Sequence, residues 1–208
     1  MRIDFVSDIS CPWCAIGLHS LELALARLGD TVNVDLHFQP FELNPDMPPE
    51  GADAVAYLAR KYGTSAEQVA QSRRRIVERG TEVGFAFGNR TRVWNTFDAH
   101  RLLHWAGLES RQRELKHALL RACHCDDENP GAHDVLLRLA GSIGLPLARA
   151  RSILESGEFG AEVRRQQAYY RGLGIDSVPS VIVDGQHLIQ GGQPPEVFEQ
   201  ALRELATA

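Results

Sequence analysis

The 208-residue sequence lacks an apolar run of the ~20 residues that a membrane-spanning helix needs. Its N-terminus also lacks the basic and apolar regions of a signal peptide, and the chain contains no internal repeat or low-complexity linker. No large excess of charge is present: the formal net charge is −5, so nothing favours nucleic acid or an anionic membrane as a partner. We therefore expect a globular cytoplasmic protein that binds neither.

Cysteine is scarce, with four residues in two close pairs, Cys11/Cys14 and Cys123/Cys125. In the cytoplasm thiols are mostly reduced, so a close pair of cysteines is more often catalytic or metal-binding than structural. The remaining composition is ordinary, and the hydrophobic share of 44% is enough to form a full core. The cysteine pairs are therefore the first candidates for chemistry.

The first 45 residues carry the pattern of a strand, a helix and a second strand. Residues 2–6 are apolar and partly β-branched, which predicts a strand. A helix is predicted from residue 11 to the glycine at position 29, with leucines at helical spacing: Leu18, Leu21, Leu25 and Leu28. Residues 32–38 alternate between apolar and polar, which predicts a half-buried strand closed by Pro40 and Pro45. The order βαβ predicts two parallel strands with a right-handed crossover.

The rest of the chain is first helical and then forms a hairpin. Residues 50–175 contain no convincing strand, and helices are predicted near residues 51–62, 65–83, 96–107, 110–124, 131–143, 147–156 and 160–172. Two apolar runs, 180–183 and 186–190, are joined by Asp184-Gly185, which is a strong hairpin signal. A terminal helix over 195–206 begins with prolines, which the first helical turn tolerates.

This order, βαβ followed by ββα, predicts an α/β thioredoxin fold with a large all-helical insertion. We assign residues 1–45 and 175–208 to the two parts of the thioredoxin fold and residues 46–174 to the insertion domain. The insertion is the only large element available to wall a cleft over Cys11. We expect residues 95–104 to lie near Cys11, and residues 73–75, three arginines, to form a distant solvated face.

The motif Cys11-Pro12-Trp13-Cys14 stands where the first strand leads into a helix. Unpaired backbone N–H groups and the helix dipole at this point favour the thiolate of Cys11. Cys14 lies one turn further on, so it can close a disulfide with Cys11 and resolve a mixed disulfide formed there. Trp13 is expected to be partly exposed beside the pair, as a contact surface for substrates. We therefore favour a redox centre over half a zinc site or two inert thiols.

For residues 123–125 and for Asp4, the sequence leaves more than one interpretation open. A zinc site needs a second ligand pair, and residues 123–125, Cys-His-Cys, are the only candidate. For that segment we consider buried free thiols, an auxiliary redox pair, or a metal site with His117 or His133. Asp4 is either a buried acid that exchanges protons with Cys14 or an exposed strand carboxylate. We predict no metal and no bound organic cofactor.

Four segments along the chain carry a family resemblance: residues 7–14, residues 95–102, the Val178–Pro179 step and residues 191–194. With them the sequence resembles the DsbA-like thioredoxin superfamily, specifically its FrnE-like branch, which neighbours 2-hydroxychromene-2-carboxylate isomerases and kappa-class glutathione transferases. The resemblance implies that the Val178–Pro179 bond is cis and lies against the cysteine pair, where the Val178 backbone can bind a substrate strand. It also implies that the insertion caps the active site. His100, in the second segment, is either a substrate-binding residue of the cleft or a helix-packing histidine.

We predict an enzyme, a thiol–disulfide oxidoreductase that exchanges disulfides with protein substrates or small thiols such as glutathione through Cys11. In the isomerase and kappa transferase branches a serine commonly occupies the reactive position, whereas both Cys11 and Cys14 are present here. The alternatives are a glutathione-dependent isomerase or transferase, and a zinc-stabilised binding module. The direction of electron flow, the physiological substrate and the oligomeric state, a homodimer included, stay open.

Overall fold

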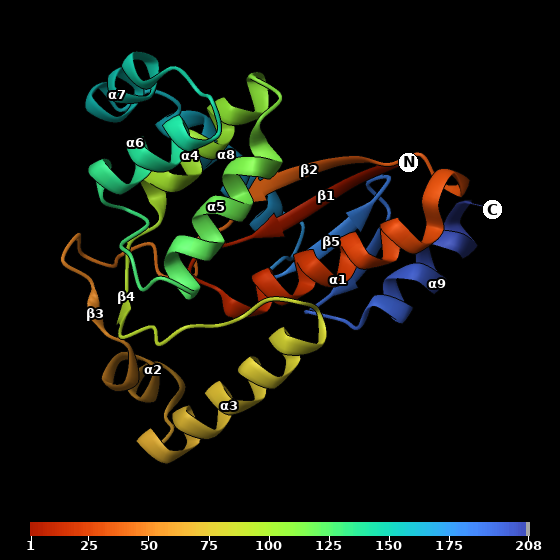
Figure 1. The fold of residues 1–208 in the computed structure, drawn as a ribbon, viewed down its shortest axis with the longest axis horizontal. Helices are drawn as coiled ribbons and strands as arrows, with labels where there is room; N and C mark the ends of the chain where they lie inside the picture. The colour runs from red at the N-terminus through yellow and green to blue at the C-terminus, as the bar shows by residue number, and fades with distance from the viewer. Residues whose placement is uncertain (207–208) are drawn as a thin grey trace.

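The computed structural model describes residues 1–206, in which four strands form one mixed sheet in the order β2-β1-β5-β6 (Figure 1). Strand β1 (Arg2–Ser7) pairs in parallel with β2 (Asp35–Pro40) and antiparallel with β5 (Ser180–Val183). Strand β5 continues through a hairpin into β6 (His187–Gln190). Strands from both ends of the chain therefore lie side by side, and the predicted thioredoxin fold with a helical insertion is confirmed.

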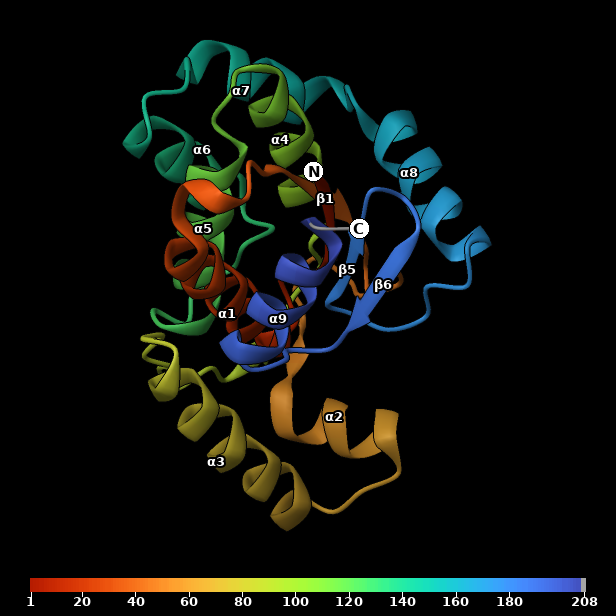
Figure 2. The ribbon, with the colours of Figure 1, turned by 90° about the vertical axis from the view of Figure 1, so that its right-hand side faces the viewer.

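Two helices belong to the thioredoxin fold itself. Helix α1 (Pro12–Leu28) connects β1 to β2, and α9 (Pro195–Ala206) follows β6; the two pack together on one face of the sheet (Figures 1 and 2). Seven helices lie between β2 and β5: α2 (Ala54–Tyr62), α3 (Ala66–Glu82), α4 (Phe97–Leu108), α5 (Gln112–His124), α6 (His133–Ser142), α7 (Leu147–Ser156) and α8 (Gly160–Gly172). In both views α2 and α3 lie on the opposite side of the molecule from α6 and α7. No helix within residues 1–206 is long and apolar enough to cross a bilayer.

The hydrophobic interior has two large parts. One lies between the sheet and the pair α1 and α9, and contains Phe5, Leu18 and Phe198, all fully buried. The other lies among helices α4 to α7, and Ile9, from the loop after β1, packs into it. Because Ile9 is two residues before Cys11, the helical core holds the loop that leads to the cysteine pair.

Strand β2 differs from its prediction. It begins at Asp35 rather than at residue 32, because a short 3-10 turn (η1, Gly29–Thr31) follows α1 and pairing with β1 starts only after it. It also includes Pro40, which was expected to close it. Pro40 is tolerated because β2 is an edge strand, where alternate backbone nitrogens face away from β1. At that outer edge the Gln112 side chain pairs with Phe38: its Oε1 accepts from Phe38 N and its Nε2 donates to Phe38 O, both at 3.0 Å.

The predicted helices of the insertion agree with the observed ones to within three residues at each end. The prediction of no strand between residues 50 and 175 is wrong in one detail. Strands β3 (Ala52–Asp53) and β4 (Arg92–Val93) form a two-residue antiparallel pair. Two residues are too few for a period-two pattern, and the pairing joins segments far apart in the sequence. The division of the chain into three segments stays a prediction.

Candidate active site

Cys11 occupies the position immediately before α1. Its backbone is extended, and Pro12 takes the first helical position, where no N–H donor is needed. Cys11 N donates to Asp8 O at 3.3 Å, and Cys14 N donates to Cys11 O at 3.1 Å. The Cys11 side chain therefore sits at the positive end of the helix dipole, at the carboxyl end of β1.

The two thiols differ in their surroundings. Both are free; Cys11 is 4% exposed and lines a cavity, whereas Cys14 is completely buried. A hydrogen bond from the Cys14 thiol lowers the pKa of Cys11 below the ordinary value, and backbone N–H groups of Cys14 and Trp13 add to this effect. Burial, followed by the interaction with Cys11, raises the pKa of Cys14 well above its ordinary value. The outer thiol is thus the more acidic one.

The segment before β5 lies against the pair. The Val178–Pro179 peptide bond is cis, and the Cys11 Sγ lies 3.5 Å from the carbonyl oxygen of Val178. Trp13 is half-buried and lines the same cavity as Cys11. The structure therefore brings Cys11, Cys14, Trp13 and Val178 together.

Asp8 is a buried acid of the site that the sequence did not single out. Its Oδ1 accepts from Ser10 N at 3.1 Å and from the Thr96 hydroxyl at 2.8 Å, and its Oδ2 accepts from Leu43 N at 2.7 Å. Burial alone would raise the pKa of Asp8, but the interaction with His100, followed by the bonds from Leu43 and Thr96, holds it below its ordinary value. The carboxylate therefore joins the loop before Cys11 to the segment after β2 and to the start of α4.

Asp4 and His100 lie away from the thiols. Asp4 forms a salt bridge with Arg2 at 2.8 Å and accepts from Gln39, and it has no contact with Cys14 among the described residues. His100 is 2% exposed, and its Nε2 lies 3.4 Å from Asp8 Oδ1. His100 does not line the Cys11 cavity, so its position favours helix packing over direct substrate contact.

Two residues of the insertion, His124 and Arg90, hold the loop that precedes Cys11. Burial lowers the pKa of His124 to about 3, so the ring is neutral; its Nε2 donates to Ile9 O at 2.8 Å. Arg90 donates to Ser10 O at 2.7 Å and lies 3.4 Å from His124 Nδ1. Arg90 was not predicted, because an arginine in a loop carries no local signal of its partners.

The cavity in front of Cys11 has a volume of about 580 Å³. Its apolar wall comes mainly from α2 and α3, and three cations, Lys61, Arg73 and Arg90, also line it. The apolar side chains include Val55, Leu58, Tyr62, Val69, Ile76, Val77 and Phe87. Figure 1 shows these two helices below the start of α1. The site can therefore hold an apolar group next to a negatively charged one.

The expectation about the wall of this cavity is corrected. The arginines at 73–75 were expected far from Cys11, but Arg73, on α3, lines the cavity, whereas Arg74 and Arg75 are exposed. Residues 95–104 were expected near Cys11; Thr96 and His100 reach Asp8 in the loop before it, but α4 does not line the cavity. Arg73 is also held in place, because its guanidinium donates to Gly88 O at 2.8 Å and to Arg90 O at 3.2 Å. The amphipathic pattern of α3 predicts which side of the helix is polar, but it does not predict which other part of the protein lies next to that side.

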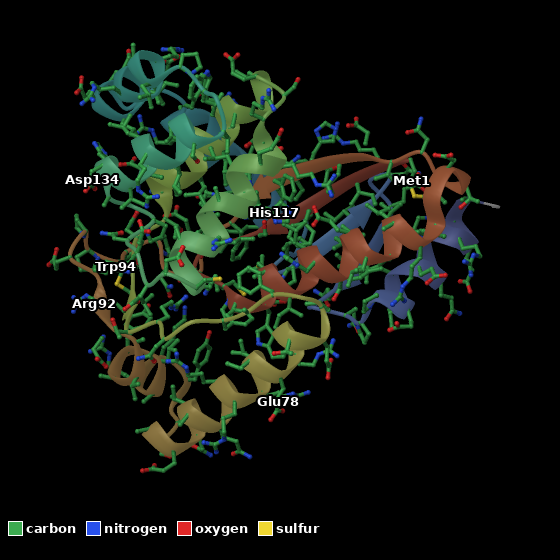
Figure 3. The ribbon with its side chains drawn as sticks, in the orientation of Figure 1. Met1, Glu78, Arg92, Trp94, His117 and Asp134 are labelled. Carbon is green, nitrogen blue, oxygen red and sulfur yellow. The ribbon has the colours of Figure 1, made fainter. Side chains whose placement is uncertain are left out.

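The second cysteine pair, like the first, is reduced in the structure. Cys123 and Cys125 are both free; burial raises the pKa of Cys123 to about 11, and it also raises the pKa of the half-buried Cys125. Figure 3 shows His117, on α5, on the side of that helix facing α1, where its Nε2 lies 2.8 Å from Glu22 Oε1. His133 contacts Asp98 at 2.9 Å. Residues 1–206 contain no group of three or more His, Cys, Asp or Glu side chains placed to hold a metal ion.

A four-stranded sheet with a helical insertion, and a cysteine pair at the start of the first helix, define a thioredoxin-fold protein of the DsbA type. The chain belongs to the DSBA-like thioredoxin domain family, which matches residues 2–203. It is similar to the crystal structure of the probable DsbA oxidoreductase SCO1869 from Streptomyces coelicolor, with 33% identity and a TM-score of 0.92 over 98% of this chain and 89% of that one.

Two more distant solved structures share the fold. The cytosolic disulfide reductase DsbM from Pseudomonas aeruginosa, solved with GSH, is 16% identical over all of both chains, with a TM-score of 0.68. A 2-hydroxychromene-2-carboxylate isomerase is 12% identical over 99% of this chain and 96% of that one, with a TM-score of 0.74. At these low sequence identities, the similarity shows a shared fold alone.

Proposed function

We propose that this protein is a thiol–disulfide oxidoreductase in which Cys11 is the nucleophile and Cys14 the resolving thiol. Its substrates would be protein disulfides or small thiols such as glutathione. The observation that carries the proposal is the asymmetry of the pair: Cys11 has a lowered pKa and lines the cavity, and Cys14 is buried beside it with a raised pKa. A thiolate that a substrate can reach from the cavity and a protonated thiol behind it are what sequential exchange requires.

The reaction follows from this arrangement. The Cys11 thiolate attacks one sulfur of a substrate disulfide, and the other substrate sulfur departs as a thiolate. Cys14 then attacks Cys11 Sγ, which forms the Cys11–Cys14 disulfide and releases the second substrate sulfur. Val178 offers its backbone to an extended substrate next to Cys11, and Trp13 offers an apolar surface.

The positive charges of the cavity favour a substrate with a negatively charged group near its reacting sulfur. Lys61 donates to Leu43 O at 2.8 Å, and with Arg73 and Arg90 it lines a wall that is mainly apolar and has no carboxylate. A carboxylate near the reacting sulfur, as in glutathione, complements these charges. We also propose a reducing compartment, the cytoplasm, supported by the likeness to a disulfide reductase described as cytosolic.

Reduction of insulin disulfides by single-cysteine variants tests the proposal. Cys11→Ser should fall to the background rate, and Cys14→Ser should accumulate mixed disulfides with the substrate, because the resolving thiol is gone. Cys125→Ser is the matched control: its thiol does not line the Cys11 cavity and the variant should keep the wild-type rate. Wild-type activity in Cys11→Ser would overturn the proposal.

A glutathione-dependent isomerase or transferase is the second candidate, favoured by the apolar cavity next to Cys11, which suits a small organic substrate. That chemistry needs one thiol or thiolate at the site rather than a pair. Isomerase or transferase turnover that survives in Cys14→Ser, without any mixed disulfide, would favour this candidate over disulfide exchange.

A further inference from the structure

A second cavity, separate from the one in front of Cys11, has no part in the proposed function. It has a volume of about 580 Å³ and lies between β2, α4 and α5, which are close together in Figure 1. Among residues 1–206, none lines both cavities. A cavity of this volume is within the range of small-molecule sites, so the side chains that line it indicate the class of ligand it would take.

Lys116, on α5, brings an unpaired positive charge to the wall of this cavity. The residue is 1% exposed, and within residues 1–206 its ammonium makes no hydrogen bond or ion pair. The ammonium is nevertheless not one of the unpaired atoms that are sealed from solvent, which belong to Ser20, Glu42 and Trp94. The small surface that Lys116 retains therefore includes the ammonium, and it opens into the second cavity, which Lys116 lines.

The other charged side chains of this wall already have partners. Asp35 and His37, both on β2, pair with each other at 2.7 Å. The remaining contacts join wall residues to side chains outside the cavity: Arg2 to Asp4, His100 to Asp8, Arg113 to Glu22 and Glu114 to Arg111. The ring of His104 packs against Phe159. Of the lysines and arginines in the described wall, Lys116 alone is thus without a carboxylate partner.

A charged lysine is rarely buried without a partner, because removing its charge from water is unfavourable. Burial lowers the pKa of Lys116 to about 8, against the charges of Cys14, Asp8 and Cys11, which raise it. At pH 7 the group is therefore still mainly an ammonium. An anion bound in the cavity would supply the missing partner.

We propose that the second cavity binds a small organic monocarboxylate, whose carboxylate accepts hydrogen bonds from the Lys116 ammonium. One unpaired positive charge matches one negative charge. A dianion such as a phosphate monoester would bring a second negative charge to a wall that also holds Asp35 and Glu114. The apolar body of the ligand meets Leu36 and Leu103. No cysteine within residues 1–206 lines this cavity, so the inference goes beyond the proposed function and does not rest on it.

The two lysines of the chain, Lys61 and Lys116, allow the two cavities to be followed separately. In protein labelled with ¹³C at the lysine Cε, each lysine gives its own NMR signal, and the spectrum of Lys61→Met assigns them. The probe is benzoate. It should shift the Lys116 signal and raise the pKa of that ammonium by about one unit, because a bound carboxylate favours the charged form; one unit corresponds to about tenfold tighter binding to that form.

The affinity should also follow the charges of ligand and site. By linkage, benzoate binding at Lys116 should weaken about tenfold between pH 7 and pH 10, as the ammonium loses its proton. Benzamide, which has the same ring without the charge, should bind at least about tenfold more weakly. Phenyl phosphate, a dianion, should bind no more tightly than benzoate.

Arg113→Met is the matched control, because it removes an exposed cation of the same wall that is paired with Glu22. It should change the benzoate affinity by less than about twofold.

Two kinds of result would overturn the proposal. If benzoate leaves the Lys116 signal unmoved, or shifts that of Lys61 alone, the second cavity is not a carboxylate site. Equal binding of benzamide, or tighter binding of phenyl phosphate, would refute a monocarboxylate as the ligand. These measurements involve no thiol chemistry, so the proposed function stands or falls separately, on insulin reduction by the single-cysteine variants.

Discussion

At the scale of single residues, the thiol pair can be tested by chemical labelling. Cys125 is more exposed than Cys11, but its pKa is raised by burial whereas that of Cys11 is lowered by the hydrogen bond from Cys14. Iodoacetamide reacts with thiolates, so Cys11 should be modified first at pH 7, and the preference should narrow as the pH rises past the ordinary thiol pKa of about 8.5.

Peptide mass spectrometry of partly alkylated, reduced protein measures this order. Cys14 and Cys123 are both buried with raised pKa values, so they should stay unmodified longest. Faster labelling of Cys125 at pH 7 would mean that access rather than acidity controls reactivity, and would contradict the assignment of Cys11 as nucleophile.

The sequence predicts the residues whose role is set by nearby positions and misses those set by distant ones. Cys11 and Cys14 could be assigned because strand, motif and helix are adjacent. Asp8 and His124 could not, because Asp8 bonds to Thr96, 88 positions away, and His124 to Ile9, 115 positions away. A polar residue buried by tertiary packing leaves no local pattern, and Lys116 on α5, which is 1% exposed, is the clearest case.

At the scale of elements, the contact between α1 and the segment before β5 is close. A Cβ atom added to Gly17 on α1 would lie 2.8 Å from Pro179 Cγ. Gly17→Ala should therefore push Pro179, and with it the Val178 carbonyl, away from Cys11. We expect a loss of about 1–3 kcal/mol in unfolding free energy from overpacking, together with slower insulin reduction.

A matched variant lies at the end of α8. Gly172 is also helical, but nothing lies within 4 Å of an added Cβ, so Gly172→Ala should keep its activity and gain up to about 1 kcal/mol. Urea denaturation and insulin reduction measure both quantities. If Gly17→Ala behaves like Gly172→Ala, close packing at this contact does not control the site.

Helices were more predictable than strands. The insertion helices and α9 follow from apolar periodicity and from glycine and proline at their ends, which are local signals. The start of β2 and the existence of β3 and β4 depend instead on pairing with another strand. That partner is distant in the sequence, so no local pattern predicts it.

At the scale of the whole molecule, the position of α2 and α3 in front of Cys11 predicts that the protein discriminates between large and small disulfide substrates. Tyr62 lies on α2 at the wall of the Cys11 cavity and is 60% exposed. A protein substrate would contact this rim, whereas a small disulfide would lie deeper. Tyr62→Ala should lower kcat/KM for insulin about fivefold, which corresponds to an aromatic contact of about 1 kcal/mol, and affect oxidised glutathione less.

Tyr169 provides the control, because it is 61% exposed on α8 and lies outside the cavity. Tyr169→Ala should leave both substrates unaffected. Equal losses for insulin and oxidised glutathione in Tyr62→Ala would show that α2 is a general support of the site without a part in selection. The sequence could not place α2 and α3 here, because periodicity gives the face of a helix but not its neighbours.

The amide of Gln112 has a consequence for the behaviour of the protein in solution. By bonding both the N–H and the carbonyl of Phe38, it occupies the outer edge of β2 as a neighbouring strand would. An open edge strand recruits extended chains from other molecules and seeds aggregates. If the protein acts on cysteine-containing chains as proposed, each encounter with a partly unfolded substrate would carry that hazard. One glutamine side chain thus helps to keep the sheet from growing by strand addition at β2.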